Sequence, residues 1–302
     1  MKQIVLIDGK YVAFKMHFSH LNLKATNGTP TGMLHGFLSE LLRINRLLPE
    51  ARIIICWDGE GQTWRHKFFP EYKANRQPNP EFKRMLTQID LLVPILRQLG
   101  LWVLKMDGVE ADDMIGMVAC RLSEKLRAEI RIYSKDRDMF QLVNDYVWVW
   151  PDPKLPPLRR SDIEKWLGAP FGALMEIRAM AGDPGDNLHG LPGVGQITAV
   201  KLWKQGLRLS DLSNGALYSK YKEHWKRVKK EYKCAQIVTD PLSDVWPRET
   251  SKRLCELLDL VEETPERDVD RGERHRRKVY GFLSEYDLNE LLAVRQKLFR
   301  LP

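Results

Sequence analysis

The chain has 302 residues, of which 43% are apolar, so it can form one large domain or two smaller ones with sizeable cores. Its apolar runs are far shorter than the roughly 18 residues of a membrane-spanning helix, which excludes an integral membrane protein of helical type. Four scattered cysteines without a Cys-x-x-Cys pair argue against a zinc finger and favour the reducing cytoplasm. The net charge of +8 fits a polyanionic partner such as nucleic acid, or a role in solubility.

Short apolar runs alternate with longer helical patterns along the first half of the chain. Five runs predict buried strands, at residues 4–7, 53–56, 101–104, 130–133 and 147–150. Apolar residues at helical spacing predict helices at residues 33–48, 82–100, 113–126, 161–168 and 171–182, and one that begins near Gln196. This alternation predicts an α/β fold, with a mostly parallel sheet flanked by helices and a helical region from about residue 161.

Acidic residues follow four of the predicted strands. They are Asp8, Asp58, the group Glu110, Asp112 and Asp113, and the pair Asp136 and Asp138. A single acid in such a place is commonly a turn former or a helix cap, but neighbouring parallel strands would bring all of these acids to one edge of the sheet. Converging carboxylates repel one another unless protons or cations neutralise them, and Mg²⁺ or Mn²⁺ would fit such oxygen ligands.

A turn-rich segment at residues 182–206 leads into the helix that begins near Gln196. Gly193 and Gly195 precede this helix, and glycines in that position let backbone N–H groups approach a phosphate. Asp183 and Asp186 lie at the start of the segment and could add two carboxylates to the metal cluster.

Aromatic residues accompany the two segments that flank the predicted cluster. Trp64, Phe68, Phe69 and Tyr72 either stack on the bases of a bound strand or pack onto the body of the protein, and packing is the better prediction for Phe68 and Phe69. After the first strand, helical spacing predicts core packing for at least two of Tyr11, Phe14 and Phe18.

Five motifs together resemble those of a known family, the 5′ nucleases of flap endonuclease type. In order they are "LIDG" (6–9), "WDG" followed by "WRHKFFPEYKANR" (64–76), "GVEADD" (108–113), "SKDRDMFQLV" (134–143) and "GDPGDNLHGLPGVGQITAVKL" (182–202). The match is best to the bacterial and bacteriophage branch, which includes the 5′→3′ exonuclease domain of DNA polymerase I. Because the five blocks keep the family's order over two thirds of the chain, the resemblance is specific.

The resemblance implies a PIN-like sheet in a nuclease domain at residues 1–160, with a helical arch at about 60–90. It implies a helical C-terminal region at 161–302 that contains a helix–three-turn–helix element at about 182–206. It implies two bound Mg²⁺ or Mn²⁺ ions. The first ion would be held by Asp8, Asp58, Glu110 and Asp112. The second would be held, directly or through water, by Asp113, Asp136, Asp138, Asp183 and Asp186.

Basic residues take the remaining roles that the resemblance implies. Lys73 and Arg76 match the catalytic basic pair of the arch. DNA contacts are expected from Arg65, Tyr72, Gly193, Gly195 and Lys201. The family also holds a monovalent cation, commonly K⁺, at the glycine turn. Lys135 and Arg137 depart from the family pattern, because they flank the acids of "SKDRD" and change the local charge.

The function implied is a structure-specific 5′ nuclease, a flap endonuclease and 5′→3′ exonuclease, acting in DNA replication or repair. We expect a monomer in the cytoplasm of a bacterial or phage-infected cell, with branched DNA, RNA–DNA primer ends and replication proteins as partners. Two alternatives stay open. One is a PIN-like ribonuclease, which generally lacks the arch and the glycine turn, and the other is a non-catalytic protein that binds branched DNA.

Overall fold

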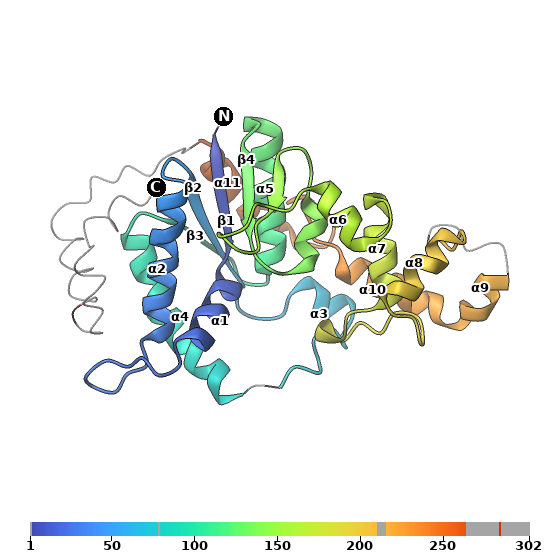
Figure 1. The fold of residues 1–302 in the computed structure, drawn as a ribbon, viewed down its shortest axis with the longest axis horizontal. Coiled ribbons are helices and arrows are strands. Elements are labelled where there is room, and N and C mark those ends of the chain that lie inside the picture. Colours follow the sequence, from blue (N-terminus) through green and yellow to red (C-terminus); the bar gives the residue numbers. More distant parts are fainter. Residues whose placement is uncertain (1, 78, 210–215, 264–283, 285–302) are drawn as a thin grey trace.

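A parallel sheet forms the centre of the molecule in the computed structural model, which describes residues 2–77, 79–209, 216–263 and 284 (Figure 1). Its five strands are all parallel and stand in the order β3-β2-β1-β4-β5. The strands are β1 (Gln3–Asp8), β2 (Arg52–Trp57), β3 (Trp102–Lys105), β4 (Glu129–Tyr133) and β5 (Val147–Val149). Each predicted strand is found within two residues of its expected place, so the α/β prediction is confirmed.

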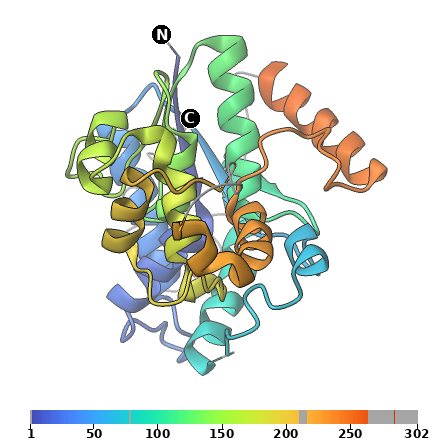
Figure 2. The ribbon, with the colours of Figure 1, turned by 90° about the vertical axis from the view of Figure 1, so that its right-hand side faces the viewer.

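Helices cover both faces of this sheet, because its strands are apolar on both sides. In β1, Val5 and Ile7 join one buried cluster, and Ile4 and Leu6 join the other. The first face packs against α1 (Gly9–Ser19), α2 (Gly32–Leu47) and α4 (Pro80–Gln98). The second face packs against α5 (Ala111–Leu126), beside which α11 (Arg248–Glu263) lies (Figure 2).

From residue 160 to residue 263, the part of the chain that the structure describes is helical between turns, as predicted. Its elements are α6 (Arg160–Leu167), η2 (Phe171–Ala173), α7 (Leu174–Ala181), η3 (Pro184–Asp186), α8 (Gln196–Lys204), α9 (Ala216–Tyr221), η4 (Lys222–His224) and α10 (Trp225–Ala235). Helices α7, α8 and α10 pack together and continue the core that α5 forms with the sheet. The domain boundary at residue 160 stays a prediction, and the basic run at 271–278 lies outside the described residues. Among the described helices, none has the length and apolar character needed to cross a membrane.

The segment of residues 64–77, here called the arch segment, crosses below the carboxyl ends of the strands (Figure 1). It contains α3 (Trp64–Phe68) and leads to α4. Trp64, Phe69 and Tyr72 are buried, whereas Phe68 is 36% exposed. These aromatic residues therefore hold the segment on the body of the protein, and Phe68 alone among them presents a partly open ring. On α1 the expectation of core packing was wrong for Phe14 and Phe18, which are 42% and 46% exposed.

Candidate active site

The carboxyl ends of the central strands carry the acids at the centre of the site. Asp8 ends β1 and caps α1, since its Oδ1 accepts a hydrogen bond from the Tyr11 N–H at 2.9 Å. Its Oδ2 accepts a hydrogen bond from the buried Ser134 hydroxyl, directly after β4, at 2.9 Å. Asp58 follows β2 and accepts a hydrogen bond from the Ala111 N–H, which begins α5, at 2.9 Å. The pairing of β1 with β2 and β4 thus gathers these acids at one edge of the sheet, as the sequence predicts.

Four carboxylates at this edge, those of Asp8, Asp58, Asp112 and Asp136, lie close enough to influence one another. Burial raises the pKa of Asp8 to about 6, and the negative charges of Asp58 and Asp136 contribute to the rise. Burial likewise raises the pKa of Asp112 well above its usual range, and the charges of Asp136 and Asp8 add to this. Buried acids that repel one another form a donor set that a divalent cation stabilises, because the cation takes the place of protons.

Glu110 has a different environment, although only one residue separates it from Asp112. Its buried carboxylate accepts hydrogen bonds from Lys73 Nζ at 2.7 Å, Thr63 Oγ1 at 2.8 Å and the Tyr72 hydroxyl at 3.1 Å. Burial would raise the pKa of Glu110, but the charges of Arg65 and Lys73 outweigh it and lower the pKa to about 2. Glu110 is therefore ionised at neutral pH and fixes the arch segment over the strand ends.

A second group of carboxylates lies between β4 and the turn that joins α7 to α8. Asp138, in η1 (Arg137–Leu142), forms an ion pair with Arg178 of α7, which also lies 3.3 Å from Asp183. Burial raises the pKa of Asp138 to about 7, although the Arg178 charge opposes the rise and neighbouring carboxylates add to it. Asp186, in η3, accepts a hydrogen bond of 2.7 Å from Arg76.

Lys73 and Arg76 of the arch segment lie between the two groups of carboxylates. Lys73 Nζ is 2.7 Å from Glu110 and 4.0 Å from Asp186. The Lys73 backbone is left-handed, with φ +56°, and its N–H donates to the Asp186 carbonyl at 3.0 Å. A left-handed conformation costs a non-glycine residue about 1–2 kcal/mol, and such strain concentrates at functional sites. The structure thus holds the predicted basic pair against the acids of both groups.

Basic side chains engage several of the acids that the sequence assigns to metals. The ion pairs are Lys10–Asp58 (2.7 Å), Lys73–Glu110 (2.7 Å), Arg76–Asp186 (2.7 Å) and Arg178–Asp138. As the side chains stand, no three Asp, Glu, His or Cys residues within 2–77, 79–209 and 216–263 are arranged to hold a metal ion. A divalent cation at this site would therefore have to replace some of these ion pairs, which would free lysine and arginine side chains for phosphate.

We predict that Mg²⁺ raises Tm more at pH 8 than at pH 5. Because the pKa of Asp8 is raised to about 6, stability that is present when it is protonated is lost as the pH rises through 6. At pH 8 a bound cation stabilises the folded state, by about 2.7 kcal/mol when Mg²⁺ is present at a hundredfold excess over its Kd. At pH 5 protons compete with Mg²⁺ for the carboxylates, so the stabilisation is smaller. Thermal melts at both pH values with and without Mg²⁺ test this, and an equal rise at both would place the metal elsewhere.

The structure corrects the prediction that Asp113 is a metal ligand. Its carboxylate is fully buried and accepts two hydrogen bonds from Arg65, at 2.6 and 2.7 Å. Trp64 Nε1 and the Val238 N–H donate to the same carboxylate at 3.1 and 2.9 Å. Consecutive helical residues point about 100° apart, so Asp113 faces the interior while Asp112 faces the strand ends. With these four bonds in place, Asp113 joins α3, α5 and the segment after α10.

Arg65 and Tyr72 are also not placed where the predicted DNA contacts require them. Arg65 is 3% exposed, and beyond Asp113 it donates to the carbonyls of Cys234 and Gln236. Tyr72 is 3% exposed, with its hydroxyl on Glu110. Both residues anchor the arch segment. The basic and aromatic composition of residues 64–76 suggested a DNA surface, but the burial of these two side chains leaves them no access to DNA.

The turn between α7 and α8 presents the predicted glycines at an open surface. Gly193 has φ +69°, and nothing lies within 4 Å of a Cβ built at Gly193 or at Gly195, the N-cap of α8. Backbone N–H groups at this helix start are therefore accessible to a phosphate. Lys201 is exposed but lies in the last turn of α8, away from the glycines, so any phosphate it contacts is a different one.

Glu231 of α10 supports this turn, although it lies in none of the motifs that the sequence analysis singles out. Its carboxylate is 1% exposed and accepts hydrogen bonds from the N–H groups of His189 and Gly190, at 3.1 and 2.9 Å. Arg227, one turn earlier on α10, donates to the Gly190 carbonyl at 2.8 Å. Glu231 lies three residues after Val228, on the same face of α10, and both are buried while the lysines between them are exposed. This helical spacing was the available signal, because an acid on a buried face needs hydrogen-bond donors.

We predict that Glu231→Ala loosens the turn and weakens DNA binding. Two hydrogen bonds to a buried charged acceptor are lost, and each contributes about 1.5–3 kcal/mol. Filter binding of duplex DNA and thermal melts measure the two effects, with Glu223→Ala, an exposed acid before the same helix, as the control. Unchanged DNA affinity together with a lowered Tm would separate the turn from DNA binding.

The fold and the site together define an α/β nuclease whose acidic strand ends lie beneath a basic arch. The chain belongs to the 5′-3′ exonuclease family, because residues 3–167 match the model of the "5'-3' exonuclease, N-terminal resolvase-like domain". It is 30% identical over 271 residues to a 5'-3' exonuclease of Buchnera aphidicola subsp. Schizaphis graminum, covering 84% of this chain and 93% of that protein. This confirms the resemblance drawn from the motifs, and structure-specific 5′ nuclease activity is the function that the family membership supports.

Other relatives show the extent of the likeness. A 5'-3' exonuclease of Aquifex aeolicus is 27% identical over 305 residues, which cover 99% of this chain and 97% of that protein. The thermostable DNA polymerase I of Thermus thermophilus is 32% identical over 250 residues, but these span 79% of this chain and only 29% of the polymerase. A crystal structure of T5 D15 protein co-crystallised with metal ions shares the fold, with a TM-score of 0.73 at 18% identity, covering 86% of this chain and 100% of that chain.

Proposed function

We propose that the chain is a Mg²⁺-dependent 5′→3′ exonuclease and flap endonuclease that hydrolyses phosphodiesters of branched DNA with two metal ions. One observation carries the proposal: carboxylates from three neighbouring strand ends converge beside Lys73, whose charge acts on both Asp58 and Asp112. Solved structures with a similar fold support both the metal and the substrate class: one is T5 5'-exonuclease with bound divalent metal ions, and another is a bacteriophage T5 flap endonuclease pseudo-enzyme-product complex with DNA and metal ions.

The chain's own residues would divide the work as follows. Asp8, Asp58, Asp112 and Asp136 would hold the first cation, and Asp138, Asp183 and Asp186 would hold the second directly or through water. Bound divalent cations supply charge stabilisation and an activated water in phosphodiester hydrolysis. Glu110 sets the position of the arch segment through Lys73.

The basic pair would act on the substrate phosphate. Lys73 Nζ, which Glu110 holds over the strand ends, can donate to a phosphate oxygen as a point charge. Once Asp186 binds metal, its partner Arg76 can bind a phosphate in a bidentate manner. Both side chains extend from the arch segment, Lys73 to Glu110 and Arg76 to Asp186. Negative charge that develops on the scissile phosphate is then stabilised by fixed donors.

A 5′-labelled flap duplex, incubated with Mg²⁺ and then with excess EDTA, tests the proposal. We expect a metal-dependent cut near the junction of single strand and duplex, which leaves a 5′-phosphate and a 3′-hydroxyl. Cleavage of an RNA strand alone would support the PIN-like ribonuclease instead. Tight DNA binding without cleavage would support the non-catalytic alternative.

The remaining parts of the proposal rest on the family resemblance. They are a K⁺ ion at the glycine turn, RNA–DNA primer ends as further substrates, a monomeric state, contacts with replication proteins and a cytoplasmic location in a bacterial or phage-infected cell. The open glycine turn at Gly193 supports a site for backbone phosphate. Replacing K⁺ by tetramethylammonium in DNA-binding assays should weaken duplex affinity if the turn holds a monovalent ion.

Lys73→Ala is expected to lower kcat by about 10²- to 10³-fold with only a modest loss of DNA affinity. The reason is that Lys73 stabilises charge in the transition state, and removing one such donor costs about 2.7–4 kcal/mol. Single-turnover cleavage and equilibrium binding separate the two effects. Lys67→Ala, an exposed lysine of α3, is the matched control. A pure loss of affinity would assign Lys73 to positioning.

A further inference from the structure

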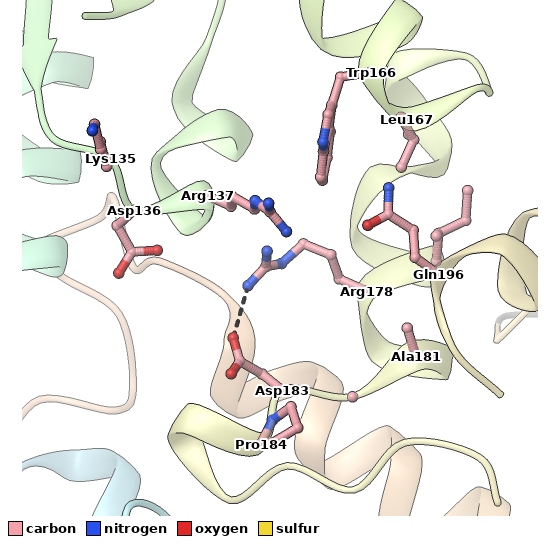
Figure 3. Close-up of a pocket in the computed structure, with 12 residues that line it drawn as sticks. Lys135, Asp136, Arg137, Trp166, Leu167, Arg178, Ala181, Asp183, Pro184 and Gln196 are labelled. Carbon is pink, nitrogen blue, oxygen red and sulfur yellow. Dashed lines mark hydrogen bonds and ion pairs between the residues drawn. The ribbon is translucent and has the colours of Figure 1, made fainter. Parts of the chain in front are cut away.

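A cavity of about 430 Å³ lies beside the second group of carboxylates, and Lys135, Arg137, Trp166 and Gln196 in its lining have no role in the metal site. It opens between η1, α6, α7 and the start of α8 (Figure 3). Its lining includes Lys135, Arg137, Trp166, Arg178 and Gln196, with Asp136 and Asp183 at one side. The cavity therefore connects the acidic strand ends with the N-terminus of α8, and both are places where phosphates are expected.

Cations in this cavity outnumber their carboxylate partners. Within the part of the chain that the structure describes, Lys135 and Arg137 make no hydrogen bond or ion pair, and both are exposed. Arg178 is paired with Asp138 and Asp183, yet its buried Nε has no hydrogen-bond partner among the described residues. The guanidinium groups of Arg137 and Arg178 point toward the same region of the cavity (Figure 3). Like charges held together in this way favour an anion between them.

Trp166 of α6 provides an apolar wall for the same cavity. Its ring is 37% exposed, although most large aromatic side chains of the described residues are buried. Phe140 holds it in an edge contact, with ring centroids 5.3 Å apart. The Arg137 guanidinium lies 5.0 Å from the indole centroid. Indole rings and guanidinium planes are both surfaces on which proteins stack nucleic-acid bases.

We propose that this cavity binds one nucleotide of the DNA substrate, with its phosphate held by Arg137 and Arg178 and its base or sugar against Trp166 (Figure 3). The proposal rests on the 5′ nuclease function and adds a specific subsite to it. A phosphate and a flat apolar group joined by a short linker match the charged and aromatic walls, and the volume admits a single nucleotide. Cation binding by Asp136 and Asp183 would neutralise the acidic side and strengthen the preference for phosphate.

Photocrosslinking tests the subsite without requiring cleavage. Flap duplexes, each with 5-iododeoxyuridine at a single position, are bound in EDTA, irradiated and digested, and the crosslinked peptides are identified by mass spectrometry. We expect one position, or two adjacent ones, to crosslink to Trp166. If DNA crosslinks to other parts of the protein but never to Trp166, the subsite is wrong while the nuclease function stands. If the DNA crosslinks to Trp166 but wild-type protein does not cleave it with Mg²⁺, the function fails and the subsite stands.

Variants give a second readout. The logarithm of the DNA association constant falls as the logarithm of the salt concentration rises. For Arg137→Ala this decline should be less steep by about 0.9, because one phosphate contact is lost. Trp166→Ala should weaken binding roughly five- to a hundredfold, the effect of losing one stacked base. Arg160→Ala is the matched control, because Arg160 is also an exposed arginine over an aromatic ring, that of Phe171, but lies outside the cavity. Equal affinities and salt slopes for Arg137→Ala and wild type, with both proteins folded, would overturn the proposal.

Discussion

Asp113→Asn is expected to lower the free energy of unfolding by about 3–5 kcal/mol and Tm by roughly 6–20 °C. The substitution leaves the Arg65 guanidinium buried, 3% exposed, without its bidentate carboxylate partner. The nearest remaining acid is Glu110, 3.6 Å from Arg65 Nη1, and its oxygens are already engaged by the arch segment. Removal of one partner from a buried ion pair leaves an uncompensated charge, which is why the loss is large.

Thermal melts and calorimetric Mg²⁺ titrations distinguish this structural role from metal binding. At temperatures where Asp113→Asn remains folded, we expect Mg²⁺ affinity close to that of wild type. A double variant, Arg65→Met with Asp113→Asn, should be less destabilised than the sum of the single variants, because the unpaired charge is gone. A wild-type Tm with lost Mg²⁺ affinity would return Asp113 to the metal site.

The sheet and the acids at its strand ends could be predicted from the sequence because both depend on local pattern. A short run rich in isoleucine such as residues 53–56 predicts a buried strand, and adjacent parallel strands place Asp8 and Asp58 at the same edge. The order of the five motifs along the chain then indicated the 5′ nuclease family. These predictions required no knowledge of which distant segments meet.

The partners of Arg65 could not be predicted, because they come from a distant part of the chain. Asp113 lies 48 residues from Arg65, and the carbonyls of Cys234 and Gln236 lie 169 and 171 residues from it. In the sequence, Arg65 looks like any basic residue of a DNA-binding run, and Asp113 looks like its neighbour Asp112. Burial separates the roles of these residues, and burial depends on tertiary packing.

Tertiary packing also explains why the spacing of aromatic residues on α1 predicted the wrong side chains for the core. Helical spacing of Phe14 and Phe18 predicts an apolar face, but α1 already buries Val12, Ala13 and Met16 against the sheet. The two phenylalanines therefore lie on the open side of the helix and contact each other, with ring centroids 4.9 Å apart. Periodicity gives the faces of a helix but does not say which face the rest of the protein covers.

Asp112→Asn should have the opposite signature to Asp113→Asn, although the chemical change is the same and the residues are adjacent. Partial burial of the Asp112 carboxylate and the negative charges of Asp136 and Asp8 raise its pKa. Removing its charge is expected to raise Tm at pH 8 in the absence of metal. Cleavage should fall by about 10³-fold or more, since a metal contributes several kcal/mol of transition-state stabilisation and each 1.36 kcal/mol is tenfold in rate.

DNA binding by Asp112→Asn should survive or strengthen, because one negative charge near the substrate phosphate is gone. Flap binding in EDTA, single-turnover cleavage in Mg²⁺ and thermal melts at pH 8 give the three readouts, with Asp113→Asn measured alongside. Wild-type turnover in Asp112→Asn would refute its role as a metal ligand. A fall in Tm would show that Asp112 is stabilised by a partner rather than strained by its neighbours. The opposed outcomes of the two variants follow from a single turn of α5, which presents one carboxylate to the cluster and the other to Arg65.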